Sequence, residues 1–391
     1  MPPMPLLVLC DAPCLPSGLG RITRDLCYVL STMPEFRIAT LGRAGLGSAR
    51  LPWPQYCFPE LARDGLATWG ETHLLQAWTD FAGKEEGVLF TIWDPSRLLW
   101  LVHHDGLPLD LASFLEKRPF KLWGYCAIDH GGPGPNGELG KLESTVLQRY
   151  DRVLAYTIWG SEMIKASTGR DVEWLYHGIN LESFSSRGKE AGRLSLKLPQ
   201  DGLVIGVNMT NQERKDWGLA ARVCREIANR RRDARFWWHT EHADRYWSMT
   251  ALLHDYGISD KTALVVGGGY SDRELSYFYS ACDVTMLPSL GEGFGYPVVE
   301  SMAAGVPCVV GAYGGQAELV PEERRVKPAA YRLDTRYNCL RPTYDPVTWA
   351  DVTMRVVAEP QDPEGERAKV EHLDWGVMAE PFKKWSLEGI R

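Results

Sequence analysis

The sequence predicts an α/β fold in which two doubly wound parallel sheets follow one another along the chain. Its 391 residues exceed what one hydrophobic core commonly organises, so two domains are expected. Short apolar runs bounded by glycine, proline or aspartate alternate with segments of helical period, which is typical of βαβ units. This alternation stops in a polar segment, residues 178–202, and then begins again, which indicates a second sheet.

The apolar runs are the strands expected in each sheet. The first series consists of LLVLC (6–10), RIATL (37–41), GVLFTIW (87–93), KLWGYCAI (121–128) and RVLAYT (152–157). The second consists of LVIGVNM (203–209), ARFWWHT (234–240), ALVVGG (263–268), DVTMLP (283–288) and VPCVVG (306–311). We therefore expect an N-terminal domain over 1–185, a C-terminal domain over 186–365, and a helical tail over 366–391 that packs back toward the first domain. Because ligands bind at the carboxyl ends of such strands, we expect the two domains to face a central cleft.

The composition is that of a globular protein, with 45% hydrophobic and 24% charged residues. No apolar run approaches the roughly 18 residues of a membrane span, so stable membrane association is not expected. The first residues include no basic segment and their apolar run ends at Asp11, so a signal peptide is not expected either. Nine cysteines without a Cys-x-x-Cys pair argue against a disulfide framework or structural zinc, and favour a cytoplasmic location. The formal charge of −7 disfavours broad contact with nucleic acid, and the basic segment 222–235 reads either as a helix surface or as a local basic patch.

Two glutamates flank a glycine-rich loop in the stretch EGFGYPVVE. Pro297 suits the first position of a helix and Gly305 suits the residue just past its end. Glu292 then lies in the loop and Glu300 in the first turn, where the helix dipole alone would favour a carboxylate. The glycines between them allow the backbone to approach a ligand with its amides, as phosphate-binding turns do. A loop that offers amides to phosphate and carboxylates to hydroxyl groups suits a nucleotide-sugar as its ligand.

The longer stretch DVTMLPSLGEGFGYPVVESMAAGVPCVV, residues 283–310, resembles the signature of the retaining glycosyltransferases of family 4. The resemblance implies the GT-B architecture, which consists of two Rossmann-like domains. It also implies that Glu292 contacts the transferred sugar and that Glu300 holds the ribose hydroxyls of the donor. The backbone between the glutamates is then expected to contact sugar and phosphate, at Gly293, Phe294 and Gly295.

Two further stretches resemble the same family. The N-terminal glycine loop of the family is similar to PSGLGRITRDL, which implies donor-binding roles for Gly18 and Gly20, although a tight turn alone would also explain these glycines. The family segment that delivers an arginine and a lysine to the diphosphate resembles GVNMTNQERKDWGL. Lys215 fits the lysine. The arginine position five residues earlier holds Thr210, so Arg214 is the candidate replacement.

The sequence contains no Asp-x-Asp pair, so Lys215, Arg214 and amides at helix starts are expected to neutralise the leaving diphosphate without a metal or other cofactor. Asp129 and His130 follow the apolar run KLWGYCAI, at the strand end where catalytic groups lie. By the family resemblance His130 hydrogen-bonds the donor sugar, while Asp129 either orients sugar or acceptor or caps its own loop. Together with Glu292 they are the expected catalytic residues.

The predicted function is the retaining transfer of a hexose, glucose from UDP-glucose, to a hydroxyl acceptor. The acceptor stays open among a saccharide, a small metabolite, a protein and a hydroxymethylated pyrimidine in DNA. Similarity to compact, partly phage-encoded family members favours DNA, as do 15 tryptophans and 16 tyrosines that could stack an extruded base. With a net charge of −7, DNA binding would require a basic track formed by Arg21, Arg24, Arg97 and Arg118.

Three functions of other kinds also fit the sequence. A sugar-nucleotide epimerase or a phosphorylase would share the architecture, and an epimerase would need no hydroxyl acceptor. A dinucleotide-dependent oxidoreductase could use Gly18 and Gly20, but the third glycine of that fingerprint is missing. A non-catalytic sugar-binding or nucleic-acid-binding module would bind its ligand without turnover. Fold alone does not separate these functions.

Overall fold

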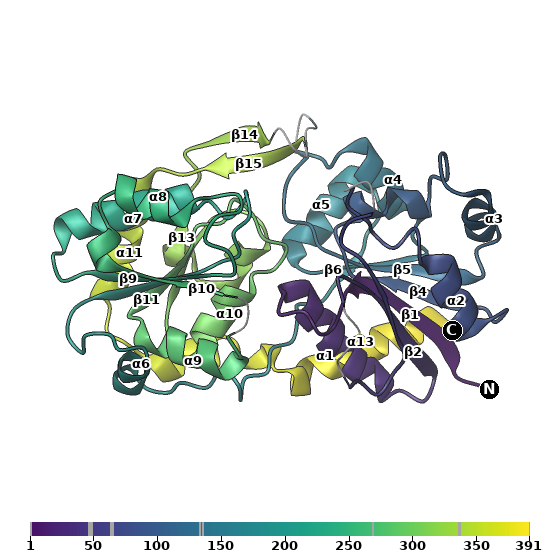
Figure 1. Ribbon diagram of the computed structural model, residues 1–391, viewed down its shortest axis with the longest axis horizontal. Helices are drawn as coiled ribbons and strands as arrows, with labels where there is room; N and C mark the ends of the chain where they lie inside the picture. The colour runs from purple at the N-terminus through teal and green to yellow at the C-terminus, as the bar shows by residue number, and fades with distance from the viewer. Residues whose placement is uncertain are drawn as a thin grey trace. The chain divides into compact units, whose positions relative to one another are not determined.

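The structure is a computed structural model that describes residues 2–45, 50–62, 66–132, 134, 137–267, 270–334 and 338–390. The chain forms two compact units, which consist of Met1–Gly178 with Gly376–Arg391, and of Ile179–Trp375. Each unit contains its own parallel sheet covered by helices, so the predicted α/β class is confirmed (Figure 1). The domain limits predicted from composition, at 185/186 and 365/366, both lie within the second unit.

The first unit contains a parallel sheet with the strand order β3-β2-β1-β4-β5-β6-β7. The chain builds outward from β1 in one direction and returns to start the other half at β4, so the sheet reverses its order between β1 and β4. Ligands bind at such a reversal, beyond the carboxyl ends of the strands. The strands are β1 (Met4–Asp11), β2 (Phe36–Arg43), β3 (Gln55–Phe58), β4 (Gly87–Thr91), β5 (Phe120–Cys126), β6 (Arg152–Ala155) and β7 (Glu173–Trp174).

Helix α1 shows how sequence fixes the elements of this unit. Ser17 caps it by accepting a hydrogen bond from the Gly20 amide at 3.0 Å. Its buried residues Ile22, Leu26 and Leu30 recur every four positions and face the sheet. The helices of the unit are α1 (Gly18–Ser31), α2 (Leu74–Ala82), η1 (Pro95–Leu101), α3 (Leu109–Lys117), α4 (Lys141–Arg149), α5 (Ile158–Thr168) and most of α13 (Trp375–Ile390).

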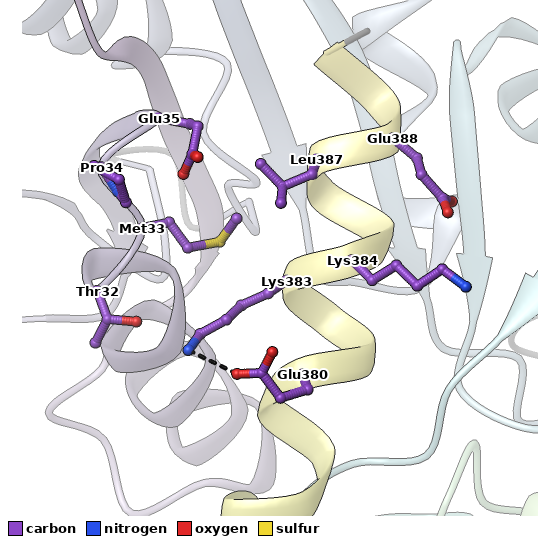
Figure 2. A pocket seen from close by; sticks show the side chains of 9 residues that line it. All are labelled: Thr32, Met33, Pro34, Glu35, Glu380, Lys383, Lys384, Leu387 and Glu388. Atoms are coloured by element: carbon purple, nitrogen blue, oxygen red, sulfur yellow. Dashed lines mark hydrogen bonds and ion pairs between the residues drawn. The ribbon is translucent and has the colours of Figure 1, made fainter.

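The C-terminal helix α13 packs on the first sheet through aromatic side chains. The ring centroids of Trp385 and Trp123 are 5.3 Å apart, and those of Phe382 and Tyr125 are also 5.3 Å apart. The other side of α13 forms a cavity of about 440 Å³ with the turn before β2 (Figure 2). Glu35, which lines this cavity, immediately precedes β2, so the cavity lies at the amino edge of the sheet, opposite the edge where ligands are expected.

The second unit contains a parallel sheet with the order β10-β9-β8-β11-β12-β13 and a separate antiparallel pair, β14 and β15. The order of the parallel sheet reverses between β8 and β11. The sequence analysis did not predict the antiparallel pair. The strands are β8 (Val204–Asn208), β9 (Arg235–Thr240), β10 (Thr262–Val266), β11 (Val284–Leu287), β12 (Cys308–Gly311), β13 (Arg325–Val326), β14 (Ala330–Asp334) and β15 (Cys339–Thr343).

The polar segment expected to connect the domains is partly helical, and all of it after Gly178 belongs to the second unit. Helix α6 packs so closely on α9 that a Cβ atom at Gly192 would lie 2.7 Å from the Ala281 amide nitrogen. The helices of this unit are α6 (Lys189–Ser195), α7 (Trp217–Arg230), α8 (Met249–Asp255), η2 (Ser259–Lys261), α9 (Asp272–Ala281), α10 (Tyr296–Ala303), η3 (Gly315–Leu319), η4 (Glu322–Arg324), α11 (Pro346–Ala358), α12 (Pro363–Ala368) and η5 (Glu371–Leu373).

All ten apolar runs predicted as strands contain a strand of the structure; Gly268, which ends one of them, lies outside the described residues. The basic segment 222–235 forms the C-terminal part of α7, the turn after it and the first residue of β9. Arg230 pairs with Asp351 and Arg231 with Asp233, so part of its positive charge is neutralised locally. Among the helices that the structure describes, none is long and apolar enough to cross a membrane.

Buried His177, next to the end of the first unit, gives a prediction for stability. Its ring centroid is 4.1 Å from that of Tyr156, and its Nδ1 is 2.7 Å from the Tyr125 hydroxyl. Burial lowers the pKa of His177 well below the ordinary value. The unfolded chain binds a proton near pH 6.5 and the folded chain does not, so the free energy of unfolding is expected to fall as pH drops below about 6.5.

Urea unfolding at pH 8 and pH 5.5 measures this effect. We expect His177→Gln to remove up to about 1.4 kcal/mol of the pH-dependent loss, since one proton contributes about 1.36 kcal/mol per pH unit. His254, whose side chain is 87% exposed, supplies the matched control, His254→Gln. Equal pH dependence in wild type and His177→Gln would contradict the prediction.

Candidate functional site

The candidate donor site lies where the second sheet reverses its order. Arg214 and Lys215 belong to the loop that joins β8 to α7, and Glu292 belongs to the loop that joins β11 to α10. Because β8 and β11 are neighbours in the sheet, these two loops leave the same edge side by side. The sheet order therefore brings together residues that are 77 positions apart in the chain.

The three side chains form one ion cluster. Lys215 Nζ contacts Glu292 Oε1, and Arg214 Nη1 lies 2.9 Å from Glu292 Oε2. Arg214 Nη1 also donates to the Gly291 carbonyl oxygen at 2.9 Å, so the guanidinium is fixed against the loop. Lys215 is 7% and Glu292 6% exposed, while the Arg214 side chain is 26% exposed. Two cations thus converge on one carboxylate in a setting that is mostly withdrawn from water.

The charge of Glu292 is determined by these partners. Burial would raise the pKa of its carboxyl, but the nearby charges of Arg214 and Lys215 outweigh burial and lower the pKa to about 2. Glu292 is therefore ionised throughout the neutral range. Because its folded pKa lies below that of the unfolded chain, its contribution to stability is present above about pH 4.3 and is lost as pH falls toward 2.

Glycines permit the backbone conformation and the close packing of the loop before α10. Gly295 caps the helix with φ of 114°, a conformation that other residues rarely adopt. The loop rests on the segment after β12, because the Gly315 amide donates to the Glu292 carbonyl oxygen at 2.8 Å. A Cβ atom at Gly314 would lie 2.9 Å from that same oxygen. Gly293 and Phe294 are buried in this loop, and the Phe294 ring meets that of Tyr296 edge to face at 5.7 Å.

The start of α10 differs from the sequence expectation. The helix begins at Tyr296, so Pro297 is its second residue and Glu300 lies beyond the first turn. The prediction that Glu300 occupies the first turn is therefore wrong, because left-handed Gly295 starts the helix one residue earlier. Glu300 is 2% exposed, and its Oε2 accepts a hydrogen bond from the Tyr279 hydroxyl at 2.6 Å. Gly305 does follow the helix, with φ of 81°.

The carboxyl edge of the first sheet carries the predicted glycine loop. Gly18 is the exposed first residue of α1, and Gly20 is buried. A Cβ atom on Gly20 would lie 2.6 Å from the Leu15 carbonyl oxygen, so the close approach of loop and helix requires glycine here. Ser17 Oγ also donates to Asp11 Oδ2 at 3.0 Å, which ties the loop to the end of β1. The pKa of Asp11 is raised by burial.

The second loop of that edge holds His130 and Asp129 after β5. His130 is 7% exposed, and its Nε2 lies 3.8 Å from Glu143 Oε2 of α4. Asp129 is half-buried in the same loop. Asp94, which follows β4, completes a group in which one ligand atom from each of Asp94, His130 and Glu143 lies within 4.8 Å of the others. These residue types could hold a divalent cation, so the predicted absence of a metal stays a prediction.

The sequence analysis missed the residues that support the predicted ones. Glu143, Tyr279 and Gly314 lie on other elements, and neither spacing nor order along the chain connects them to the site. For Gly314 a signal existed, because a Gly-Gly pair shortly after an apolar run marks a turn. Tyr279, the partner of Glu300, and Glu143, the partner of His130, carry no such signal, since a tyrosine or a glutamate on a helix is commonplace.

Comparison with known proteins identifies part of the chain. Residues 248–326, which include Tyr279, Glu292 and Glu300, match the family of glycosyl transferases group 1. This segment of the chain is therefore similar to group 1 glycosyltransferases. A D-inositol 3-phosphate glycosyltransferase of Xylanimonas cellulosilytica is 32% identical over 122 residues, which cover 31% of this chain and 25% of that protein. For four such relatives, the matched part spans between 25% and 52% of the relative's length.

Solved structures resemble the whole chain around the group 1 segment. Sucrose-phosphate synthase from Thermosynechococcus elongatus superposes with a TM-score of 0.75 at 16% identity, covering 98% of both chains. HepE of Anabaena in complex with UDP-glucose gives a TM-score of 0.71 at 14% identity, covering 98% of this chain and 100% of that one. At such identities the likeness shows the fold, which is the predicted GT-B architecture of two Rossmann-like domains.

Proposed function

We propose that this protein is a retaining glycosyltransferase that moves glucose from UDP-glucose to a hydroxyl acceptor. The ion cluster of Arg214, Lys215 and Glu292 carries the proposal, because it lies at the ligand-binding edge of the second sheet. Two preorganised cations would stabilise the charge that develops on a leaving diphosphate. The curated relatives and a solved neighbour support the donor class, since they are glycosyltransferases and a complex with UDP-glucose.

Within this reaction the predicted residues keep distinct roles. Glu292 would contact the transferred glucose, and Glu300 would accept hydrogen bonds from the ribose hydroxyls. The amides of Gly293, Phe294 and Gly295 precede α10, where a helix start favours a bound anion. In the first unit, Gly18 and Gly20 would approach the diphosphate, while His130 and Asp129 would hydrogen-bond the sugar or acceptor.

The arginines proposed for DNA binding favour a smaller acceptor instead. Arg24 pairs with Asp25 at 2.8 Å and Arg118 pairs with Asp151, so both charges are offset by neighbours. Arg97 follows the carboxyl end of β4, whereas Arg118 precedes the amino end of β5. Because those ends lie at opposite edges of the sheet, the two arginines do not form one track. A soluble saccharide or phosphorylated metabolite is therefore favoured over a hydroxymethylated pyrimidine in DNA.

A panel assay tests the reaction and its acceptor. UDP-glucose and other nucleotide-sugars are incubated with a saccharide set, phosphorylated cyclitols, a protein and DNA containing hydroxymethylcytosine or hydroxymethyluracil, and the products are analysed by mass spectrometry. We expect added hexose on a soluble acceptor, with its anomeric configuration retained in the NMR spectrum. Hexose on the DNA that declines steeply with salt would restore the DNA acceptor. An epimerised donor without any transferred sugar would replace the proposal by a sugar-nucleotide epimerase.

The reaction is expected to proceed without a divalent metal. Lys215 and Arg214 already supply positive charge beside Glu292, so the leaving diphosphate needs no metal bridge. Activity measured after dialysis against EDTA should equal that of untreated protein. Complete loss that only magnesium or manganese restores would contradict this expectation. Substituting Glu143→Gln would then distinguish a cation at Asp94, His130 and Glu143 from one carried by the donor.

A further inference from the structure

A continuous chain of hydrogen bonds runs from Glu300 across the second unit to β9. The Tyr279 hydroxyl donates to Glu300 Oε2 at 2.6 Å, and Asn208 Nδ2 donates to the Tyr279 oxygen at 2.8 Å. His239 Nδ1 lies 2.8 Å from Asn208 Oδ1, and its ring stacks on Tyr270 with centroids 4.5 Å apart. Three separate elements besides α10 therefore act on one carboxylate: α9, β8 and β9.

The direction of these hydrogen bonds follows from the donors and acceptors that each side chain offers. The Tyr279 hydroxyl has one proton, which it donates to Glu300 Oε2. The Tyr279 oxygen then accepts from the amide group of Asn208. The carbonyl oxygen of Asn208 is thereby directed at His239 Nδ1, which donates. The parallel register pairs Asn208 with His239 directly, so the backbone itself positions these two side chains.

Burial makes this series of hydrogen bonds effective at Glu300. Tyr279 is 1% and Glu300 2% exposed, so water does not replace a missing partner easily. A carboxylate held by a tyrosine hydroxyl keeps one orientation instead of several. Preorganised acceptors bind a ligand more tightly, because less freedom is lost when the ligand arrives.

We propose that Tyr279 is a positioning residue for nucleotide binding, which orients Glu300 toward the ribose hydroxyls and is itself held by Asn208 and His239. This inference rests on the proposed function, since it assigns Glu300 to the ribose. It adds a specific consequence. The relay, by which we mean the hydrogen bonds that link Glu300 through Tyr279 and Asn208 to His239, should matter for ligands that carry both ribose hydroxyls. It should matter less for a 2′-deoxyribose ligand.

Tyr279→Phe removes the hydroxyl and keeps the ring, so packing is conserved. Titration calorimetry with UDP should show about a tenfold higher Kd, and the Kd for 2′-deoxy-UDP should change less than threefold. In the transfer assay the donor KM should rise while kcat stays within about threefold. The matched control is Tyr277→Phe on the same helix, whose ring faces Arg187 and which should leave both constants unchanged.

A double-mutant cycle separates a relay from a local packing effect. Asn208→Ala should weaken UDP binding in the wild-type background and add no further loss in Tyr279→Phe, because the path to Glu300 is already broken. Additive losses would overturn the relay. UDP binding unchanged in both single variants, at unaltered melting temperatures, would overturn the whole inference. Failure of the wild-type protein to bind any nucleoside diphosphate would instead overturn the proposed function.

If Tyr279→Phe folds poorly, Asn208→Asp supplies the second test. Aspartate keeps the acceptor for His239 but cannot donate to the Tyr279 oxygen, and it competes with Glu300 for the tyrosine proton. The inference expects weaker UDP binding with little change for 2′-deoxy-UDP. Equal weakening of both ligands would indicate general disruption of the unit and would contradict the positioning role.

Discussion

Lys215→Met is expected to lower kcat by about 10²-fold or more. One preorganised charge on a leaving group is commonly worth about 2.7 to 4 kcal/mol of barrier, and methionine keeps the length of the side chain without the charge. Lys215 is 7% exposed and contacts Glu292, so its ammonium acts in surroundings where water screens it weakly. UDP should also bind more weakly, since in the proposed reaction the cation would face the diphosphate in the resting complex as well as during transfer.

Steady-state kinetics and UDP calorimetry measure both effects. Loss of the lysine also leaves Glu292 with Arg214 alone, so a lower melting temperature is expected in addition. Lys189→Met is the control, because Lys189 shares the carboxylate of Asp283 with Arg193 in a comparable three-membered ion cluster. If Lys215→Met retains activity within threefold of wild type, Lys215 does not belong to the site.

The parallel sheets were predictable because burial on both faces makes the strands apolar throughout. Runs such as LVIGVNM and DVTMLP therefore stand out without any knowledge of their neighbours. The position of the candidate donor site follows from the same pattern, since Lys215 and Glu292 each come shortly after such a run. The order of the strands along the chain does not predict that β8 pairs with β11. This pairing brings the two separate loops together and so forms the ion cluster.

Other features depend on contacts that leave no periodic signal. Strand β14 has four exposed residues of five, so its stretch AYRLD shows no alternation from which a strand could be predicted. The start of α10 depends on the left-handed conformation of Gly295, which moves Glu300 out of the first turn. The Tyr279 contact with Glu300 arises because α9 and α10 pack together, and helix packing partners are not specified by a local pattern.

Glu292→Gln is expected to lower kcat by about 10²-fold while UDP binds as tightly as before or up to about tenfold more tightly. The two effects have different origins. In the proposed reaction the carboxylate stabilises the glucose as positive charge develops on it, and a neutral amide does this poorly. Toward UDP the same carboxylate is a competitor, because it already contacts Lys215 and lies 2.9 Å from Arg214. Removing its charge leaves both cations for the diphosphate, whereas Lys215→Met removes a cation and should weaken UDP binding.

The loop itself should persist, because Gly315 holds Glu292 through the backbone carbonyl at 2.8 Å. Glu366→Gln is the matched control: Glu366 is also buried between two cations, Arg324 and Lys369, outside the site. It should lower stability without separating kcat from UDP affinity.

With a pKa of about 2, Glu292 does not titrate in the neutral range, so the kcat ratio of wild type to Glu292→Gln should stay constant between pH 6 and pH 8. Parallel losses of kcat and UDP affinity in Glu292→Gln would show that the carboxylate supports the phosphate site instead of the sugar.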